Sequence, residues 1–212
     1  MLPITQDAAR IFRITHISNV PWTLANGLHC SSSGRRDPNF RRIGNDDLIV
    51  KRPSRLVPIS PGGNLSDYVP FYFTPRSPML LNIKTGWNGV PQIPMPDVVV
   101  LSTSLGRLIE GAVPFVFTDR HAYLHTARFS SDLADLAGLD WGNFQQSDFA
   151  RDPNDPGKID RYQAEALVYN QLGIEMLEGV VCCTEESATH VRSQVAAAGI
   201  ELPVVARREF FF

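Results

Sequence analysis

Short apolar runs separated by two long polar segments are the feature that most constrains what this chain can fold into. Residues 30–67 are rich in Ser, Gly, Pro, Asn and Arg, and residues 129–161 are again polar and irregular. Loops of this length are uncommon in compact domains and usually serve a function. We therefore expect a framework of short elements that carries two long functional loops.

The apolar runs predict a set of short strands, because they are rich in β-branched and aromatic residues. A first run at 11–15 is followed by others at 68–73, 79–83, 98–102, 113–118, 180–183 and 203–206. Helices are predicted at 20–26, at about 104–111 and at 185–198 from capping signals, which include Asn19, Thr103 or Ser104, and Gly199. Few helices, short strands and long loops favour one α+β domain over residues 1–212, with a central, mainly antiparallel sheet.

Composition places the chain among folded soluble proteins. Of its 212 residues, 43% are hydrophobic and 20% are charged, and no apolar run approaches the roughly 20 residues that cross a membrane. The N-terminal residues lack the long apolar core of a secretory signal. The cysteines Cys30, Cys182 and Cys183 have no spacing typical of a disulfide framework or a zinc site. We therefore expect a cytoplasmic protein with free thiols, no membrane partner and no metal.

Charge is distributed unevenly along the chain. The net charge of -2 argues against a protein that coats nucleic acid through a generally basic surface. Between residues 35 and 55, however, the basic residues Arg35, Arg36, Arg41, Arg42, Lys51, Arg52 and Arg55 face only Asp37, Asp46 and Asp47. Such a stretch is typical either of a phosphate-binding surface or of an ordinary solvated loop. Composition does not choose between the two.

Three strings give the chain a family resemblance. They are ITHISNVPWTLANGL at 14–28, DYVPFYFTPRSPMLLNI at 67–83 and RYQAEALVY at 161–169. Together they resemble the DarT family, the toxin half of a bacterial pair in which a DNA ADP-ribosyltransferase is opposed by a macrodomain antitoxin. The second string is the most specific, and the likeness extends over nearly the whole chain, including the C-terminal FFF.

The resemblance implies an ADP-ribosyltransferase-like fold, a split and mainly antiparallel β-sheet whose crevice holds NAD as a co-substrate. It places the family's catalytic glutamate at Glu165 and starts a strand there, although the Gln, Ala and Leu around Glu165 favour a helix. It also implies that residues 31–67 form an element that covers NAD, and that residues 129–160 form a loop that faces the substrate.

The chemistry of the reaction explains why a carboxylate and a cation are expected. Cleavage of the nicotinamide–ribose bond develops positive charge on the ribose, as in glycoside hydrolysis. An ionised carboxylate stabilises that charge and can accept a proton from the incoming nucleophile. Glu165 is the candidate for both tasks. Its expected catalytic partner is Arg76 in the stiff Thr-Pro-Arg-Ser-Pro turn, which either holds an NAD phosphate or ribose or activates the acceptor base.

The resemblance also assigns residues to NAD, whereas the candidates for the acceptor come from the residue pattern at 119–129, for which an ordinary polar strand and turn is an equal alternative. His16, Ile17, Ser18 and Gly27 are expected to bind NAD together with Arg76, although a core histidine and a helix-ending glycine are the ordinary explanations for His16 and Gly27. Basic and aromatic residues interleave at 119–129, and stacking platforms assist enzymes that act on unpaired bases. The expected nucleic-acid ligands are Arg120, His121, Tyr123, Arg128 and Arg161, with Phe40, Tyr72, Trp141 and Phe144 as further aromatic candidates.

The acceptor is the least determined part of the prediction. Family members modify thymine or guanine, and residues 43–52, 119–129 and 148–165 look more similar to the guanine-modifying branch. Guanine in single-stranded DNA is therefore expected, with thymine as the alternative. An ADP-ribosyltransferase that acts on RNA or protein, or a non-catalytic module that binds NAD and nucleic acid, would carry the same motifs. The resemblance further implies toxicity in bacteria and a DarG-like macrodomain antitoxin as partner.

Overall fold

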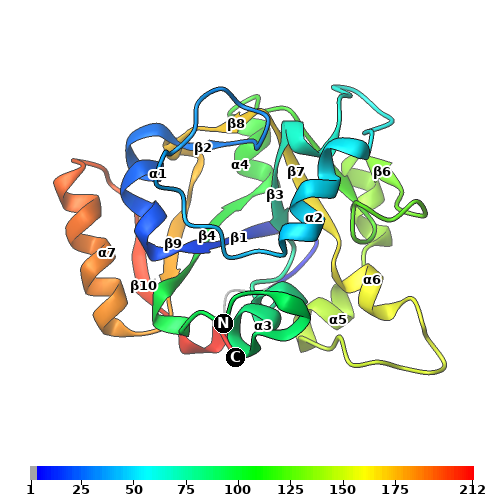
Figure 1. Ribbon diagram of the computed structural model, residues 1–212. Coiled ribbons are helices and arrows are strands. Elements are labelled where there is room, and N and C mark those ends of the chain that lie inside the picture. Colours follow the sequence, from blue (N-terminus) through cyan, green and yellow to red (C-terminus); the bar gives the residue numbers. More distant parts are fainter. Residues whose placement is uncertain (1–3) are drawn as a thin grey trace.

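An eight-stranded sheet organises residues 4–212, the part of the chain that the computed structural model describes (Figure 1). Its strands lie in the order β10-β9-β4-β1-β3-β7-β5-β6. They are β1 (Arg10–His16), β3 (Tyr68–Tyr72), β4 (Val98–Ser104), β5 (Phe115–Thr118), β6 (Phe129–Ser130), β7 (Glu165–Tyr169), β9 (Gly179–Cys182) and β10 (Val204–Ala206). Of the strand pairs in residues 4–212, that of β9 with β10 is parallel and the others are antiparallel. The predicted α+β fold with a mainly antiparallel sheet is thus confirmed.

Short helices and a small second sheet surround this framework. The second sheet pairs β2 (Leu28–His29) with β8 (Gln171–Leu172). The α-helices are α1 (Val20–Asn26), α2 (Asp46–Lys51), α3 (Pro78–Thr85), α4 (Leu105–Glu110), α5 (Trp141–Gln146), α6 (Lys158–Tyr162) and α7 (Glu185–Ala197). The predicted helices α1, α4 and α7 are confirmed, and the Ser104 hydroxyl caps α4 by accepting from the Arg107 N–H. Within residues 4–212, no helix has the length and apolar character needed to cross a bilayer.

The strand predicted at residues 79–83 is wrong, because these residues belong to α3. The Ser77 hydroxyl accepts a hydrogen bond from the Leu80 N–H at 3.2 Å, and Pro78 occupies the first turn, where its missing N–H costs nothing. An apolar run this short does not distinguish a buried strand from a buried helix. Arg76 therefore lies between a strand and a helix rather than between two strands.

Both faces of the central strands are covered, which explains their continuous apolar sequences. Val99 and Leu101 of β4 face the cluster that includes α1, α4 and α7, whereas Val98 and Val100 face α3 and the C-terminal phenylalanines. Successive side chains of a strand point to opposite faces. A strand covered on both sides therefore reads as an unbroken apolar run, as β4 does in Val-Val-Val-Leu.

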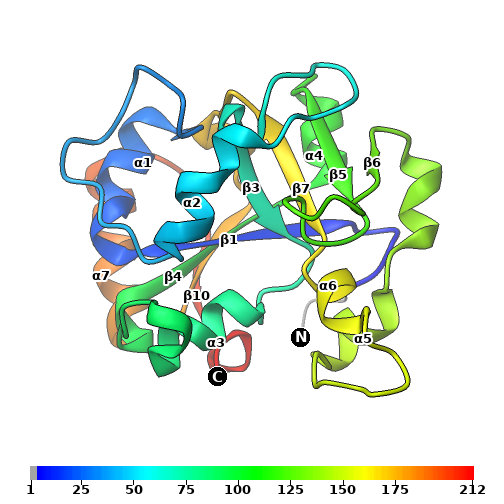
Figure 2. The same ribbon diagram turned by 45° about the vertical axis from the view of Figure 1, so that its right-hand side comes forward.

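The sheet opens between β1 and β3. β1 pairs with β4 along its whole length, from Arg10↔Ser104 to His16↔Val98, but it meets β3 through the single pair Phe12↔Tyr72. Figure 2 shows β3 and β7 rising steeply away from β1 beyond this point. The split that the resemblance implies is therefore present, and it leaves a crevice between the two halves of the sheet.

Candidate active site

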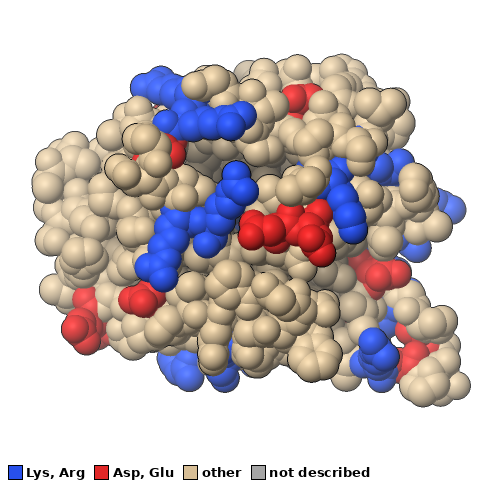
Figure 3. Space-filling view, in the orientation of Figure 1, with Lys and Arg blue, Asp and Glu red and all other residues tan. Residues whose placement is uncertain are grey.

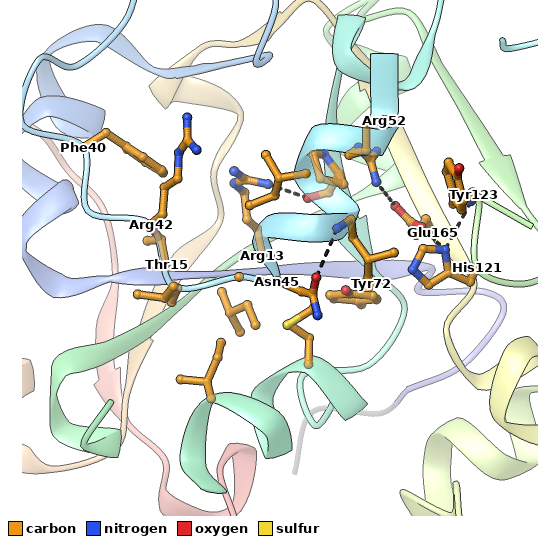
Figure 4. A pocket seen from close by; sticks show the side chains of 18 residues that line it. Arg13, Thr15, Phe40, Arg42, Asn45, Arg52, Tyr72, His121, Tyr123 and Glu165 are labelled. Carbon is orange, nitrogen blue, oxygen red and sulfur yellow. Dashed lines mark hydrogen bonds and ion pairs between the residues drawn. The ribbon is translucent and has the colours of Figure 1, made fainter. Parts of the chain in front are cut away.

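Glu165 lies at the floor of this crevice as the first residue of β7, opposite Tyr72 at the end of β3 (Figure 4). Its side chain is 3% exposed. The Arg52 guanidinium donates to Oε2 at 3.1 Å, and the Ala122 backbone N–H donates to Oε1 at 3.0 Å. The Nδ1 atom of His121 lies 3.6 Å from the same Oε1. The carboxylate is thus held from three directions, and the predicted strand start at Glu165 is confirmed.

These contacts decide the ionisation of Glu165. Burial acts to raise the pKa of the carboxyl group, but the charge of Arg52, the nearby His121 and the Ala122 N–H outweigh it, so the pKa lies below its ordinary value of 4.5. Glu165 is therefore ionised at neutral pH. Burial, and then the neighbouring Glu165, raise the pKa of Tyr72, so its phenol stays protonated and can donate a hydrogen bond.

Two half-buried arginines, each with one buried guanidinium nitrogen that has no partner, line the crevice beside Glu165. Arg13 of β1 reaches across the split and donates to the Pro70 carbonyl at 2.9 Å, and its Nε is buried without a hydrogen-bond partner. Arg52 also has a buried, unpartnered nitrogen, Nη2. Burial and the nearby Arg52 lower the pKa of Arg13 to about 10, which still leaves it charged at neutral pH. Unpaired buried donors are rare, so these two atoms point to an anionic ligand.

The crevice consists of two cavities that share walls. The smaller, about 170 Å³, reaches Glu165, His121, Tyr123 and the side chains of α3. The larger, about 420 Å³, extends toward α1 and β2 and is lined by residues that include Trp22 and His29. Both cavities are bordered by Arg13, Phe40, Arg42, Ile49, Arg52 and Pro70. They therefore form one elongated site roofed by the segment around α2.

Charged side chains gather on the face that carries this crevice. Figure 3 shows basic side chains over the segment that precedes α2, with acidic side chains next to them. Phe40 is 48% exposed beside the crevice and presents an aromatic face. In residues 4–212 no group of three or more His, Cys, Asp or Glu side chains could hold a metal ion. The polar chemistry of the site rests on guanidinium, carboxylate, imidazole and phenol groups.

The residues predicted to bind NAD through the first motif lie next to the crevice, at the end of β1 and around α1. His16 is buried, and its Nδ1 is hydrogen-bonded to Ser18, whereas its Nε2 is buried without a partner. Burial and the charge of Arg41 lower the pKa of His16, so the ring is neutral at pH 7. Neither His16, Ile17 nor Ser18 lines the two cavities, and their contact with NAD stays a prediction.

Gly27 has a structural reason to be glycine. Its φ is +77°, and a Cβ atom would lie 2.5 Å from the Leu172 carbonyl oxygen of β8. The close approach is thus between two backbone segments, and Gly27 does not line the cavities. A direct contact of Gly27 with NAD also stays a prediction.

Arg76 lies away from Glu165, in the turn between β3 and α3. Its guanidinium carbon lies 4.6 Å from the centre of the Phe212 ring, its Nε is buried without a partner, and it lines neither cavity. The cation that contacts Glu165 is instead Arg52, 113 residues away in the chain. The only sequence signal for Arg52 is its place in the basic stretch, which does not separate it from its neighbours.

Of the five residues predicted to bind nucleic acid, the structure places two at the crevice and three outside it. His121 and Tyr123 line the smaller cavity beside Glu165. Arg120 is paired with Asp119 at 3.2 Å, and Arg128 is exposed. Arg161 is held by Asp140 and Asp155 and is thus engaged inside the 140–162 segment.

The aromatic candidates are divided in the same way. Tyr72 and Phe40 line the crevice. Phe144 is fully buried and Trp141 packs against it and against Phe73, so both contribute to the core rather than to a stacking platform. This outcome is the ordinary one for large aromatic residues.

A split, mainly antiparallel sheet with an ionised glutamate at its crevice defines the ADP-ribosyltransferase class of folds. A family model described as "ssDNA thymidine ADP-ribosyltransferase, DarT" matches residues 12–212. The chain therefore belongs to the DarT family of DNA ADP-ribosyltransferases. That description names thymidine and gives no support to the guanine predicted from residues 43–52, 119–129 and 148–165.

Relatives and solved structures agree with this assignment. A DNA ADP-ribosyl transferase of Escherichia coli O127:H6 is 43% identical over 209 residues, which cover 99% of this chain and 96% of that protein. Two structures of Thermus sp. 2.9 DarT, at 32% identity, cover 97% of this chain. The complex with ADP-ribosylated ssDNA (97% of that chain covered) has a TM-score of 0.89, and the complex with NAD+ (98% covered) one of 0.86. A Thermosipho africanus transferase–glycohydrolase fusion is 34% identical over 74 residues, 34% of this chain and 19% of that protein.

Proposed function

We propose that this chain transfers ADP-ribose from NAD to a thymidine base in single-stranded DNA and releases nicotinamide. The observation that carries the proposal is the Arg52–Glu165 ion pair at the floor of the split sheet. The acceptor rests on the description of the family model and on the DNA bound by the Thermus relative. Guanine, which the sequence favours, is the outcome that the experiment below distinguishes.

The crevice fits NAD in shape and in charge. NAD is an elongated molecule whose two phosphates lie between its two nucleosides, and the two joined cavities form an elongated site whose shared wall carries Arg13, Arg42 and Arg52. Guanidinium groups are well suited to phosphate oxygens. The unpartnered Arg13 Nε and Arg52 Nη2 supply the donors that such oxygens would accept from. The Thermus relative binds NAD+, which supports the same ligand here.

The proposed chemistry uses groups on the crevice floor. As the bond between nicotinamide and ribose C1′ breaks, its electron pair goes to the nicotinamide ring nitrogen, and positive charge develops on the ribose. The ionised Glu165 stabilises this charge. The base nitrogen then bonds to C1′, and its proton passes to Glu165 and on to solvent. Arg52 keeps the Glu165 carboxylate oriented and ionised through the hydrogen bond to Oε2.

We also propose that the two long segments divide the substrates between them. Residues 31–67 cover NAD, a proposal supported by the crevice-lining residues 40–52. Residues 129–160 face the DNA, together with His121 and Tyr123 at the smaller cavity. Asn19 joins the first segment to the end of β1, because its side chain donates to the Arg41 carbonyl at 2.9 Å and accepts from the Arg41 N–H at 2.9 Å.

The experiment that tests the function is mass spectrometry of oligonucleotides incubated with NAD and the protein. Single-stranded DNA with thymidine or guanosine as its only reactive base is compared with RNA and with protein pools. The expected adduct is one ADP-ribose on thymidine, absent with Glu165→Gln and retained with Glu110→Gln, whose exposed carboxylate pairs with Arg107. An adduct confined to guanosine, RNA or protein would replace the acceptor, and no adduct at all would favour the non-catalytic module.

A cellular role follows from the same proposal. Covalent modification of DNA bases blocks their pairing, so we propose a toxin that acts in the cytoplasm and is opposed by a macrodomain hydrolase of the DarG type. The Thermosipho fusion of a transferase with a DNA ADP-ribosyl glycohydrolase supports such a partner. Induced expression in bacteria should stop growth, and either Glu165→Gln or co-expression of the hydrolase should restore it. Unimpaired growth with active protein and no hydrolase would contradict the toxin role.

A further inference from the structure

The C-terminal residues contact both β1 and the segment that precedes β7. Phe210 packs edge-on against Phe12 of β1, with 5.8 Å between ring centres and 87° between ring planes. Phe212 packs edge-on against Phe149 at 5.9 Å and 85°. Phe210 and Phe211 are each 3% exposed. Residues 210–212, which we call the C-terminal clasp, therefore lie behind the single β1–β3 pair and join β1 to the segment that leads into β7.

Arg76 contacts this clasp through the ring of Phe212. Its guanidinium lies over the Phe212 ring, at a distance where a cation is attracted by the aromatic face. In residues 4–212 Arg76 forms no ion pair, and its Nε has no hydrogen-bond partner. The ring of Phe212 is thus the main partner of this guanidinium.

A short path leads from Arg76 to the catalytic glutamate. The hydroxyl of Tyr162, which is fully buried, donates to the Arg76 carbonyl at 2.9 Å. The Tyr162 ring lies 4.9 Å from that of Phe149, the residue that Phe212 contacts. Tyr162 ends α6 three residues before Glu165, so the same contacts fix both the 149–162 segment and the entrance to β7.

We propose that Arg76 is a positioning residue, which acts through Phe212 on residues 147–163 and so sets how the acceptor DNA meets Glu165. The proposal rests on the proposed function, in which this segment faces the DNA. Arg76 lines neither cavity, so the binding of NAD should not depend on it. The sequence offers a different role, in which Arg76 touches NAD or the base directly, and the two roles make opposite predictions.

A double-mutant cycle separates the two roles. Arg76→Ala and Phe212→Leu, which keeps an apolar side chain but removes the aromatic face, should each lower kcat/KM for DNA about three- to tenfold, and the double variant should lose little more than the worse single one. The dissociation constant for NAD should stay unchanged. Losses that multiply in the double variant, or a weakened affinity for NAD, would overturn the proposal.

Salt dependence gives a second readout. A side chain that contacts a DNA phosphate contributes to the dependence of affinity on salt, and its removal reduces the slope by about one. Arg76→Ala should leave this slope unchanged, and Arg76→Lys, which keeps the cation, should retain more activity than Arg76→Met. A slope reduced by about one would assign Arg76 to the DNA backbone. Arg207→Ala, in the same C-terminal stretch but exposed, is the matched control and should behave as the parent protein.

Hydrogen exchange tests the clasp without any enzymatic activity. The amides of residues 147–163 should exchange faster in Arg76→Ala and in Phe212→Leu than in the parent protein, while those of β4 stay protected. Unchanged exchange in both variants would overturn the proposal even in a fully active protein. If the parent protein transfers no ADP-ribose, the proposed function is refuted, but the exchange rates still show whether Arg76 and Phe212 hold residues 147–163 in place.

Discussion

The Arg52 guanidinium lies 3.1 Å from Oε2 of Glu165, so the segment before β3 supplies the cation for the first residue of β7. The two side chains are 15% and 3% exposed, which shields their interaction from solvent. Arg52 comes from residues 31–67, the covering segment that roofs the crevice, and Glu165 comes from the sheet. The segment that roofs the crevice therefore also supplies the charge that lowers the pKa of the proposed catalytic carboxyl group.

Replacing Arg52 should change the pH dependence of transfer. Burial raises the pKa of Glu165 and the charge of Arg52 lowers it. The Arg52→Gln variant keeps the burial but lacks this charge, so the pKa of the carboxyl group should rise. The acidic limb of the pH–rate profile, which requires ionised Glu165, should then move to higher pH, and kcat should fall about 10²–10³-fold. Arg107→Gln, which removes an exposed pairing with Glu110, is the control. An acidic limb that stayed in place would show that Arg52 does not set the ionisation of Glu165.

Replacing Asn19 should loosen the covering segment. Asn19 is buried and its amide satisfies both backbone groups of Arg41. Asn19→Ala leaves these groups without partners and should lower the free energy of unfolding by about 1–3 kcal/mol, with a raised KM for NAD. Urea denaturation and NAD titration measure the two effects. Asn39→Ala, an exposed change in the same segment, should alter neither; an equal effect of both variants would contradict this role of Asn19.

Acid should loosen the 148–162 segment before it affects the sheet. The hydrogen bond from Lys158 lowers the pKa of Asp148, and that from Arg161 lowers the pKa of Asp155. A carboxyl group whose pKa is lower in the folded than in the unfolded protein stabilises the fold. This stabilisation is fully present at pH values above the ordinary pKa, 3.8 for Asp, and it is lost as the pH falls through the lower pKa of the folded protein. Limited proteolysis should therefore cut this segment increasingly below that ordinary value. Asp155→Asn should be cut at neutral pH, and resistance of this variant would count against the pairing.

Gly27→Ala should destabilise the fold rather than abolish NAD binding selectively. The new Cβ would meet the Leu172 carbonyl oxygen at 2.5 Å and the backbone would keep a φ of +77°, so we expect a loss of about 1–3 kcal/mol. Gly199 has a similar φ of +68° but open space around it. The difference in lost stability between Gly27→Ala and Gly199→Ala therefore measures the cost of the contact with the Leu172 carbonyl. Thermal unfolding gives both losses. A full-stability Gly27→Ala protein with no NAD affinity would assign Gly27 to the cofactor instead.

Much of the framework could be predicted from local sequence. β4 and β9 are apolar runs that the sheet buries, and α7 carries acidic residues in its first turn and is followed by Gly199 with positive φ. Local patterns failed where tertiary contacts decide. Around Glu165, helix propensity favours a helix, and α6 does end at Tyr162, but pairing with β3 makes the residues from Glu165 onward a strand. The family strings, not propensity, gave that strand.

The site could be predicted only in part, because its key contact is remote in sequence. The family motif predicts Glu165 as the catalytic carboxylate, and the structure places it at the crevice. Nothing local distinguishes Arg52 from the other basic residues of 35–55, since its role depends on folding the covering segment back over β7. Arg76 has a more distinctive motif, but the turn that carries it leads into α3 and directs its guanidinium to Phe212.

The sheet has its weakest backbone pairing between β1 and β3, which share a single residue pair. Spreading the strands there breaks few backbone hydrogen bonds, whereas any other line through the centre of the sheet crosses a long ladder. The hydrogen bond from the Arg13 guanidinium to the Pro70 carbonyl links β1 to β3 where the two strands separate. Of the strand pairs at the centre of the sheet, β1 with β3 is therefore the one whose separation would cost the fewest backbone hydrogen bonds and leave both halves of the sheet intact.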